Sequence, residues 1–295
     1  MACDLHVHST ASDGTVRPGR LAREARDAGL EAIALTDHDT TAGLKACAAG
    51  CRRHGLRFVP GIEISADPVL SADTAAPGTL HLLGLFVRAG HPRMASIAER
   101  QTAARASRNA AIIERLQQLG VKITLEQVLA LAGAEGTATI GRPHIAAVLT
   151  EAGYTRSIQD AFTRYLGRSA AAYVRRDRTP AAEAIEAIHE AGGVALLAHP
   201  VQLGFHDDAW IDHMVRKLMD LGLDGIETHH SDHTPAQCAA YEALAGRLGL
   251  LSSGGSDYHG SRKDVRLGAV RMPMTVLERL EAAARAGVNK GATGD

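Results

Sequence analysis

Short apolar segments alternate with amphipathic helical segments along most of this chain, and this alternation restricts the fold more than any other feature. The spacing of apolar residues predicts strands at 4–8, 31–36, 56–64, 80–87, 194–198, 225–228 and 250–253. Helices are predicted between most of these strands. Seven strands, each usually followed by a helix, indicate an α/β architecture with a parallel sheet, which is either open or closed into a barrel.

One stretch interrupts the alternation. Between residues 93 and 170 the apolar spacing is helical throughout, and helices are predicted at 94–119, 125–131, 143–151 and 158–166. The strand–helix alternation resumes at 171 and ends near 287. We therefore expect a first unit assembled from residues 1–92 and 171–287, an all-helical insertion at 93–170, and a flexible tail at 288–295.

Composition excludes several classes of protein. The 295 residues are 45% hydrophobic and 22% charged, which argues against disorder. Lys and Arg (32) nearly balance Asp and Glu (33), so a globally basic nucleic-acid binder is not expected. No apolar run reaches the roughly 18 residues of a membrane helix, and the first residues do not resemble a signal peptide. With only four cysteines, we expect free thiols and a cytoplasmic protein.

The 15 histidines are concentrated near the ends of the predicted strands. Sites in α/β folds form at the carboxyl ends of strands, so these positions are candidates for a functional site. Each predicted strand carries His, Asp or Glu near one end: His6, His8 and Asp13; Asp37, His38 and Asp39; Glu63; His81; His199; Glu227, His229 and His230; Asp257 and His259. Each alone is a weak signal. Buried together they are costly unless divalent cations neutralise them, and mixed His and carboxylate ligands favour Zn²⁺, Mn²⁺ or Fe²⁺ over Ca²⁺ or Mg²⁺.

An ordered set of motifs then resembles a known family, the PHP (polymerase and histidinol phosphatase) superfamily of metal-dependent phosphoesterases. The motifs are His6-x-His8, Ser12-Asp13-Gly14, Thr36-Asp37-His38-Asp39, Gly61-x-Glu63, His81-Leu82-Leu83-Gly84, Ala198-His199-Pro200 and Gly255-Ser256-Asp257-Tyr258-His259-Gly260. They lie in both segments of the first unit. The resemblance implies a distorted (β/α)7 barrel with the helical insertion acting as a substrate cap.

The resemblance also implies three divalent metal ions. His6, His8, Glu63 and Asp257 would hold the first ion, and Glu63, His81 and His199 the second, with Glu63 as the bridge. Asp13, His38 and His259 would hold the third ion. All nine positions carry residue types that can bind metal, which argues against a binding module without turnover. Mn²⁺ is the expected cofactor, with Fe²⁺ and Zn²⁺ as alternatives.

The insertion narrows the expected activity. Gly141-Arg142-Pro143-His144-Ile145-Ala146 and Ala172-Tyr173-Val174 resemble the stand-alone PHP phosphoesterases, above all the 3',5'-nucleoside bisphosphate phosphatases. We therefore expect a phosphatase that removes the 3'-phosphate of substrates such as pAp, giving AMP and phosphate. The alternative is a 5'-to-3' exoribonuclease that acts on short RNA through the same trinuclear centre. An amidohydrolase ranks lower, because the third ligand set favours phosphate.

Roles for individual side chains follow from the charge of the substrate. A hydroxide bridging the first two ions would attack phosphorus, and Asp257 or a neighbouring histidine would accept the proton of the water. His229, His230 and His233 are candidate general acids, of which we favour His233; His229 is also a candidate substrate contact.

The second phosphate of a bisphosphate needs its own cation. Arg142 and Arg178 are candidates, because a guanidinium binds phosphate through two hydrogen bonds. The expected partner is a small nucleotide or a short RNA. We expect no membrane contact and no obligate protein partner.

Overall fold

The computed structural model describes residues 2–134 and 140–292. The chain forms two compact units, one from residues 1–98 with 179–295 and the other from residues 99–178. We call these the barrel unit and the helical unit. The insertion expected at 93–170 overlaps the helical unit, whose boundaries lie a few residues later at both ends.

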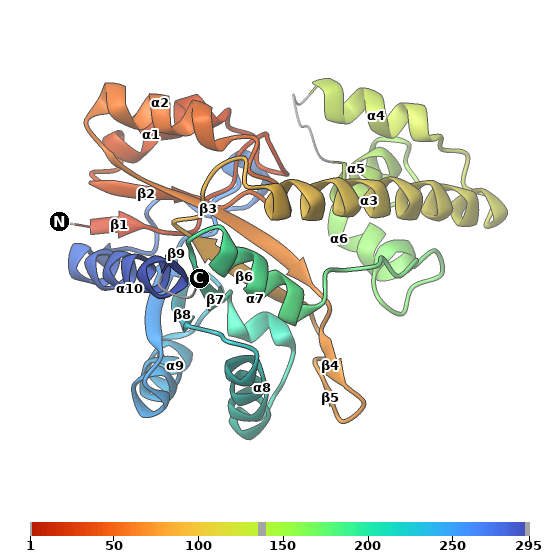
Figure 1. Ribbon diagram of the computed structural model, residues 1–295. Coiled ribbons are helices and arrows are strands. Elements are labelled where there is room, and N and C mark those ends of the chain that lie inside the picture. The colour runs from red at the N-terminus through yellow and green to blue at the C-terminus, as the bar shows by residue number, and fades with distance from the viewer. Residues whose placement is uncertain (1, 135–139, 293–295) are drawn as a thin grey trace. The chain divides into compact units, whose positions relative to one another are not determined.

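The barrel unit is built on an eight-stranded sheet with the strand order β10-β1-β2-β3-β6-β7-β8-β9 (Figure 1). The strands are β1 (Ala2–Asp4), β2 (Ala32–Leu35), β3 (Arg57–Ala66), β6 (Leu80–Leu85), β7 (Val194–Leu197), β8 (Gly225–His230), β9 (Leu251–Gly255) and β10 (Met272–Pro273). A separate hairpin pairs β4 (Val69–Ser71) with β5 (Thr74–Ala75). Six of the predicted strands are present near their expected positions, whereas the one predicted at 4–8 lies earlier, as β1, and shares only Asp4 with the prediction. The predicted PHP-type distorted barrel is confirmed.

The two ends of the sheet approach each other, so that the barrel is nearly closed. The backbone N–H of Leu5 donates to the carbonyl of Gly254 at 3.2 Å, and that of Asp257 donates to His6 at 2.9 Å. Gly255 permits this approach, because a Cβ there would lie 2.4 Å from the His6 nitrogen. The absence of a side chain at this position therefore brings β9 and Asp257 beside His6.

The expectation of an all-parallel sheet is wrong for β6, which runs antiparallel to both β3 and β7. A parallel connection needs a crossover, usually a helix, whereas the segment between β3 and β6 folds into the β4–β5 hairpin and contains no helix. The reversal places the start of β6, and not its end, at the mouth where neighbouring strands finish. His81 lies at that start and so reaches the same mouth.

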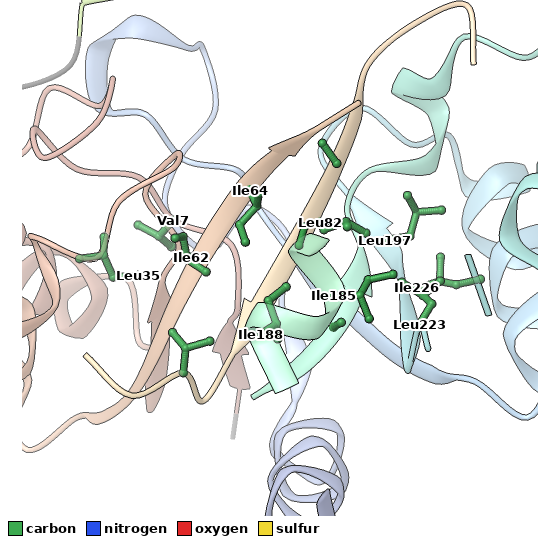
Figure 2. Packing of buried hydrophobic residues seen from close by; sticks show 14 of the residues in the cluster. Val7, Leu35, Ile62, Ile64, Leu82, Ile185, Ile188, Leu197, Leu223 and Ile226 are labelled. Atoms are coloured by element: carbon green, nitrogen blue, oxygen red, sulfur yellow. The ribbon is translucent and has the colours of Figure 1, made fainter. Parts of the chain in front are cut away.

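Five helices cover one face of the sheet: α1 (Pro18–Asp27), α2 (Leu44–His54), α7 (Ala181–Glu190), α8 (Asp208–Asp220) and α9 (Pro235–Leu248). Ile62 and Ile64 of β3 and Leu82 of β6 form a core on this face with Ile185 and Ile188 of α7 (Figure 2). Successive side chains of a strand alternate between faces, so Glu63 and His81 point to the opposite face.

That opposite face is apolar at one end and polar at the mouth. Leu83 and Leu85 of β6 pack there with Leu196 of β7 and with Leu277 and Leu280 of α10 (Met274–Ala292). The helix α10 continues to Ala292, whereas the sequence placed a tail from residue 288. A single glycine such as Gly287 costs a helix about 1 kcal/mol, which is too little to end it. Residues 293–295 of the predicted tail lie outside the described residues.

The helical unit contains most of α3 (Pro92–Gln118), followed by α4 (Leu125–Ala134), α5 (Arg142–Glu151), α6 (Ile158–Ala161) and a π-helical turn (Phe162–Leu166). These match the four predicted helices closely. Its own core contains Ile112, Leu116, Val128, Ile145 and Leu149. Within the part of the chain that the structure describes, no helix combines the length and the apolar character needed to span a membrane.

Candidate metal centre

The nine predicted metal ligands all belong to the barrel unit, and the structure brings them together, with His199 joined to the others through Glu63. The first predicted set forms one tight group. His6 Nε2 and His8 Nε2 lie 3.1 Å apart. Both nitrogens face the same two oxygens, Glu63 Oε2 at 3.3 and 3.1 Å and Asp257 Oδ1 at 3.4 and 3.2 Å.

The second predicted set shares Glu63 with the first. Glu63 Oε1 lies 2.8 Å from His81 Nδ1 and 2.8 Å from His199 Nε2. The two imidazole nitrogens are 3.4 Å apart. Glu63 is fully buried and turns one oxygen toward each set, which is the arrangement that a bridging carboxylate requires.

The third predicted set lies on the other side of His8. Asp13 is 3.3 Å from His259 Nε2 and 3.8 Å from His38 Nε2. These three residues and His8 offer ligand atoms within 4.8 Å of one another. Asp37 orders the turn before Asp13, because its carboxylate accepts hydrogen bonds from the Ser9 amide and from the hydroxyls of Ser9 and Ser12, each at 2.7 Å.

The backbone at two candidate ligands adopts an unfavourable conformation. His199 has φ = 26° and Asp257 has φ = 53°, values that residues with a side chain rarely adopt. Each such residue costs on the order of 1–3 kcal/mol and persists only where surrounding contacts enforce it. Strain of this kind concentrates at functional sites, so it agrees with the position of both residues in the cluster.

Three further residues touch the predicted ligands, and the sequence assigned no ligand role to any of them. Glu227 is fully buried, lies 2.9 Å from His6 Nδ1 and accepts a hydrogen bond from the His199 amide at 2.7 Å. His230 Nε2 and Lys263 Nζ approach Asp257 Oδ2 at 3.3 and 2.7 Å. The position of Glu227 and His230 at the end of a predicted strand is the sequence feature that could have identified them as part of the site.

The remaining predicted site residues lie elsewhere. The register of β8 against β9 shifts between Glu227 and His229, so His230 faces the cluster, whereas His229 approaches Glu242 of α9 at 3.8 Å. His233 is 5.4 Å from the His230 ring and binds the Thr228 carbonyl. Burial lowers the pKa of His233 to about 4, so its ring is neutral at pH 7.

Arg142 and Arg178 lie in the helical unit, where several arginines gather. Arg142 donates to the Leu166 carbonyl at 3.0 Å and lies over the rings of Phe162 and Tyr173. Burial is the main reason that the pKa of Arg108 falls to about 9. The positive charges of four neighbouring arginines add to this decrease: Arg176, Arg105, Arg142 and Arg178. A concentration of like charges that lowers an arginine pKa is a site suited to an anion.

The buried carboxylates of the barrel cluster are stabilised by positive charge, and the pKa values of the cluster show this. Burial favours neutral His8, but hydrogen bonds to Asp257 and Glu63 outweigh it and raise the pKa of His8 to about 10. Burial likewise opposes ionisation of Glu63, yet the charges of His38, His81 and His6 hold its pKa well below the usual value. Imidazolium protons therefore supply the charge that bound cations would supply.

Divalent cations fit this donor set. Imidazole nitrogens that face each other at 3.1 Å repel unless a proton or a cation lies between them. Two carboxylates and several imidazoles within bonding reach of a common point are ligands that Mn²⁺, Fe²⁺ and Zn²⁺ accept. Because the ligands must lose their protons to bind metal, metal binding should be coupled to proton release.

We expect Mn²⁺ binding at pH 7 to release protons into solution, since nearby carboxylates raise the pKa of both His6 and His8, and the 3.1 Å contact between their Nε2 atoms holds a proton that the metal must displace. Apparent metal affinity should rise with pH up to about pH 10, where His8 becomes neutral without metal. Calorimetry in buffers of different ionisation enthalpy measures the released protons. Binding heats that do not depend on the buffer would contradict this coupling.

A nearly closed barrel that gathers imidazoles and carboxylates at one mouth defines a class, the metal-dependent hydrolases. Within that class, the PHP domain family matches residues 4–191, and the chain belongs to this family. The resemblance found in the motifs is thus confirmed. The protein is a PHP-family metal-dependent phosphoesterase.

Characterised relatives cover most of the chain. A phosphoribosyl 1,2-cyclic phosphate 1,2-diphosphodiesterase from Eggerthella lenta is 36% identical over 87% of this chain and 94% of its own length. A 5'-3' exoribonuclease from Haemophilus influenzae is 33% identical over 87% and 89%. A 3',5'-nucleoside bisphosphate phosphatase from Chromobacterium violaceum is 29% identical over 87% and 86%. These relatives act on different phosphoesters, so similarity alone does not select a substrate.

A solved structure supports the fold along almost the whole chain. A Bifidobacterium adolescentis protein described as a metal-dependent phosphoesterase superposes with a TM-score of 0.81 at 33% identity, covering 95% of both chains. The match includes the helical unit as well as the barrel unit, because so little of either chain is left out.

Proposed function

We propose that this protein hydrolyses the 3'-phosphate of nucleoside 3',5'-bisphosphates such as pAp, yielding AMP and phosphate. The observation that carries the proposal is the convergence of all nine candidate ligands on one mouth, with Glu63 in contact with both the first and the second set. The Chromobacterium violaceum relative supports the choice of a bisphosphate. Phosphate release from pAp with Mn²⁺ supplied tests it, with 3'-AMP and 5'-AMP as comparison substrates.

The three ligand sets would each hold one divalent ion, and we propose Mn²⁺ for all three. His6, His8, Glu63 and Asp257 would hold the first, Glu63, His81 and His199 the second, and Asp13, His38 and His259 the third. Bound divalent ions lower the pKa of water and neutralise the charge of a phosphate ester, which is the chemistry this reaction needs.

The protein side chains have separate tasks in this proposal. Asp257 is proposed to accept the proton of the water; its Oδ1 faces His6 and His8, and its Oδ2 faces Lys263 and His230. His233 is proposed to pass a proton derived from the attacking water to the leaving oxygen, and His229 to contact the substrate. A cytoplasmic location remains a prediction.

Arg142 and Arg178 are proposed to hold the second phosphate. Their support is the arginine concentration around Arg108 within the helical unit, where a dianion would relieve repulsion between neighbouring guanidinium groups. Arg142 is held in place by its hydrogen bond to the Leu166 carbonyl and by two aromatic rings. A held guanidinium loses little freedom when it binds phosphate.

Arg142→Ala should raise KM for pAp by about 10-fold or more and change kcat little, because a remote phosphate contact is equal in the ground and transition states. KM for 3'-AMP, which lacks the second phosphate, should stay within about 2-fold of the wild-type value. Steady-state phosphate release measures both constants. Arg164→Ala, an exposed arginine in the same unit, is the matched control. An equal KM increase for both substrates would remove Arg142 from this role.

A second candidate activity is 5'-to-3' hydrolysis of short RNA, favoured by the Haemophilus influenzae exoribonuclease, which is more similar to this chain than the bisphosphate phosphatase is. The two candidates differ in whether a chain of nucleotides can extend beyond the cleaved ester. Incubating one enzyme preparation with pAp and with a labelled oligoribonucleotide separates them. Stepwise shortening of the RNA at a kcat/KM above that for pAp would replace the first proposal with the second.

A further inference from the structure

His230 is held in one tautomer at the edge of the metal cluster. Its ring is buried, and Nδ1 accepts a hydrogen bond from the backbone N–H of Asp232 at 3.0 Å. A neutral imidazole that accepts at Nδ1 carries its hydrogen on Nε2. That nitrogen lies 3.3 Å from Asp257 Oδ2. His230 therefore presents an N–H donor beside a candidate metal ligand, and this Nε2 has no hydrogen-bond acceptor among the described residues.

His230 also lines a cavity of about 490 Å³ in the barrel unit. The cavity lies between the segment that follows β8 and the segment that precedes β10, and its lining includes His230, Ser231, His233 and residues 264–271. Ser231 Oγ and His233 Nε2 are buried there and have no hydrogen-bond partner among the described residues. Buried polar atoms of this kind cost free energy unless a ligand satisfies them.

The size of this cavity and its two unpaired polar atoms fit a ribose with free hydroxyl groups. Pockets for small molecules have volumes of about 300–1,000 Å³ and contain a few placed polar groups. A hydroxyl-bearing ribose could bind Ser231 and the neutral His233 ring, which offer hydrogen bonds without adding charge. His230 belongs both to the lining of this cavity and to the surroundings of Asp257, so it connects the cavity to the metal cluster.

We propose that this cavity binds the leaving-group alcohol of the phosphoester, and that His230 Nε2–H donates a hydrogen bond to the ester oxygen at the junction of cavity and metal cluster. This inference rests on the proposed phosphatase function and adds the position of the leaving group. In the reaction, the oxygen of a water molecule bonds to phosphorus and the bond from phosphorus to the alcohol oxygen breaks. The alcohol leaves with a proton of that water, and His230 keeps its own.

A donor at the leaving oxygen matters in proportion to the charge that develops there. Sugar hydroxyls are poor leaving groups, so negative charge accumulates on the departing oxygen in the transition state. Nitrophenolate spreads its charge into the ring and needs little help from a donor. Loss of one positioned hydrogen bond to a developing anion typically costs 10²–10³-fold in kcat. The effect of changing His230 should therefore depend on the leaving group.

The first experiment compares His230→Ala and His230→Gln on 3'-AMP and on p-nitrophenyl phosphate. His230→Ala should lower kcat by about 10²-fold for 3'-AMP and by less than about 3-fold for p-nitrophenyl phosphate. His230→Gln retains an N–H donor and should recover part of the lost rate on 3'-AMP. His206→Gln, at an exposed histidine, is the matched control. Bound metal is measured in every variant.

The second experiment probes the cavity itself through product inhibition. Ser231→Leu fills the cavity, so it should raise the inhibition constant of adenosine by about 10-fold and leave that of inorganic phosphate unchanged. Equal loss on both substrates with His230→Ala, or an unchanged adenosine constant with Ser231→Leu, would overturn the proposal and leave the phosphatase function intact. Failure of the wild-type protein to release phosphate from any monoester would instead overturn the proposed function, and this role with it.

Discussion

Glu63→Ala is expected to abolish measurable phosphatase activity, a loss of at least about 10³-fold, and to reduce bound metal by more than one ion per chain. Glu63 approaches five imidazoles within 3.3 Å: His6, His8, His38, His81 and His199. One carboxylate that serves two ligand sets cannot be removed without weakening both. Metal analysis of the purified variant, together with phosphate release in excess Mn²⁺, measures the two effects.

The Glu63→Gln variant tests the negative charge of the Glu63 side chain separately from its size. The amide keeps the size of the side chain and one acceptor oxygen but cannot bridge two cations with two anionic oxygens. We expect Glu63→Gln to fold like the wild type and still to lose most of its activity and metal. A Glu63→Ala or Glu63→Gln variant with near-normal turnover and metal content would refute the bridging role.

Glu227→Ala is expected to weaken metal binding by 10- to 100-fold without removing any predicted ligand. Glu227 joins His6 Nδ1 to the backbone amide of His199, at 2.9 and 2.7 Å, so it fixes the ring that presents Nε2 to the cluster. A carboxylate behind a metal-binding histidine sets its tautomer and its orientation. Activity should therefore fall at limiting Mn²⁺ and recover largely at high Mn²⁺, unlike that of Glu63→Ala.

The same substitution should also destabilise the fold. Removing the Glu227 carboxylate leaves the His199 amide buried without its acceptor, which costs about 1–3 kcal/mol. Denaturant unfolding of the metal-free protein measures this loss. Glu227→Gln preserves one oxygen acceptor and should show a smaller loss than Glu227→Ala in both assays. Wild-type metal affinity in Glu227→Ala would show that His6 needs no such partner.

Much of the site could be predicted from sequence because its chemistry is carried by residue types at strand ends. His6 and His8 follow β1 at alternate positions, and Asp257 and His259 follow β9 in the same way, so each pair needed only local spacing to be recognised. His81 was predicted from its motif, although the strand that carries it runs in the direction opposite to the one expected. Its place at the start of an antiparallel strand puts it at the same mouth.

The histidines after β8 show where local pattern fails. Simple alternation along a strand places Glu227 and His229 on the same face. The register shift between them turns His229 toward Glu242 and brings His230 to Asp257. A bulge depends on how β8 pairs with β9, about 25 residues further along the chain, and not on the amino acids at the bulge alone.

By itself, the sequence determined which side chains are present to bind metal, their order, and the alternation of strands and helices that carries them, because these depend on residue type and on periodicity. The tertiary structure decided which neighbours orient those side chains: Glu227 behind His6, and His230 and Lys263 at Asp257. It also closed the barrel at Gly255, where β9 meets β1. Glu227 and His6 are 221 positions apart and the contact of His230 depends on strand register, and no local pattern encodes either.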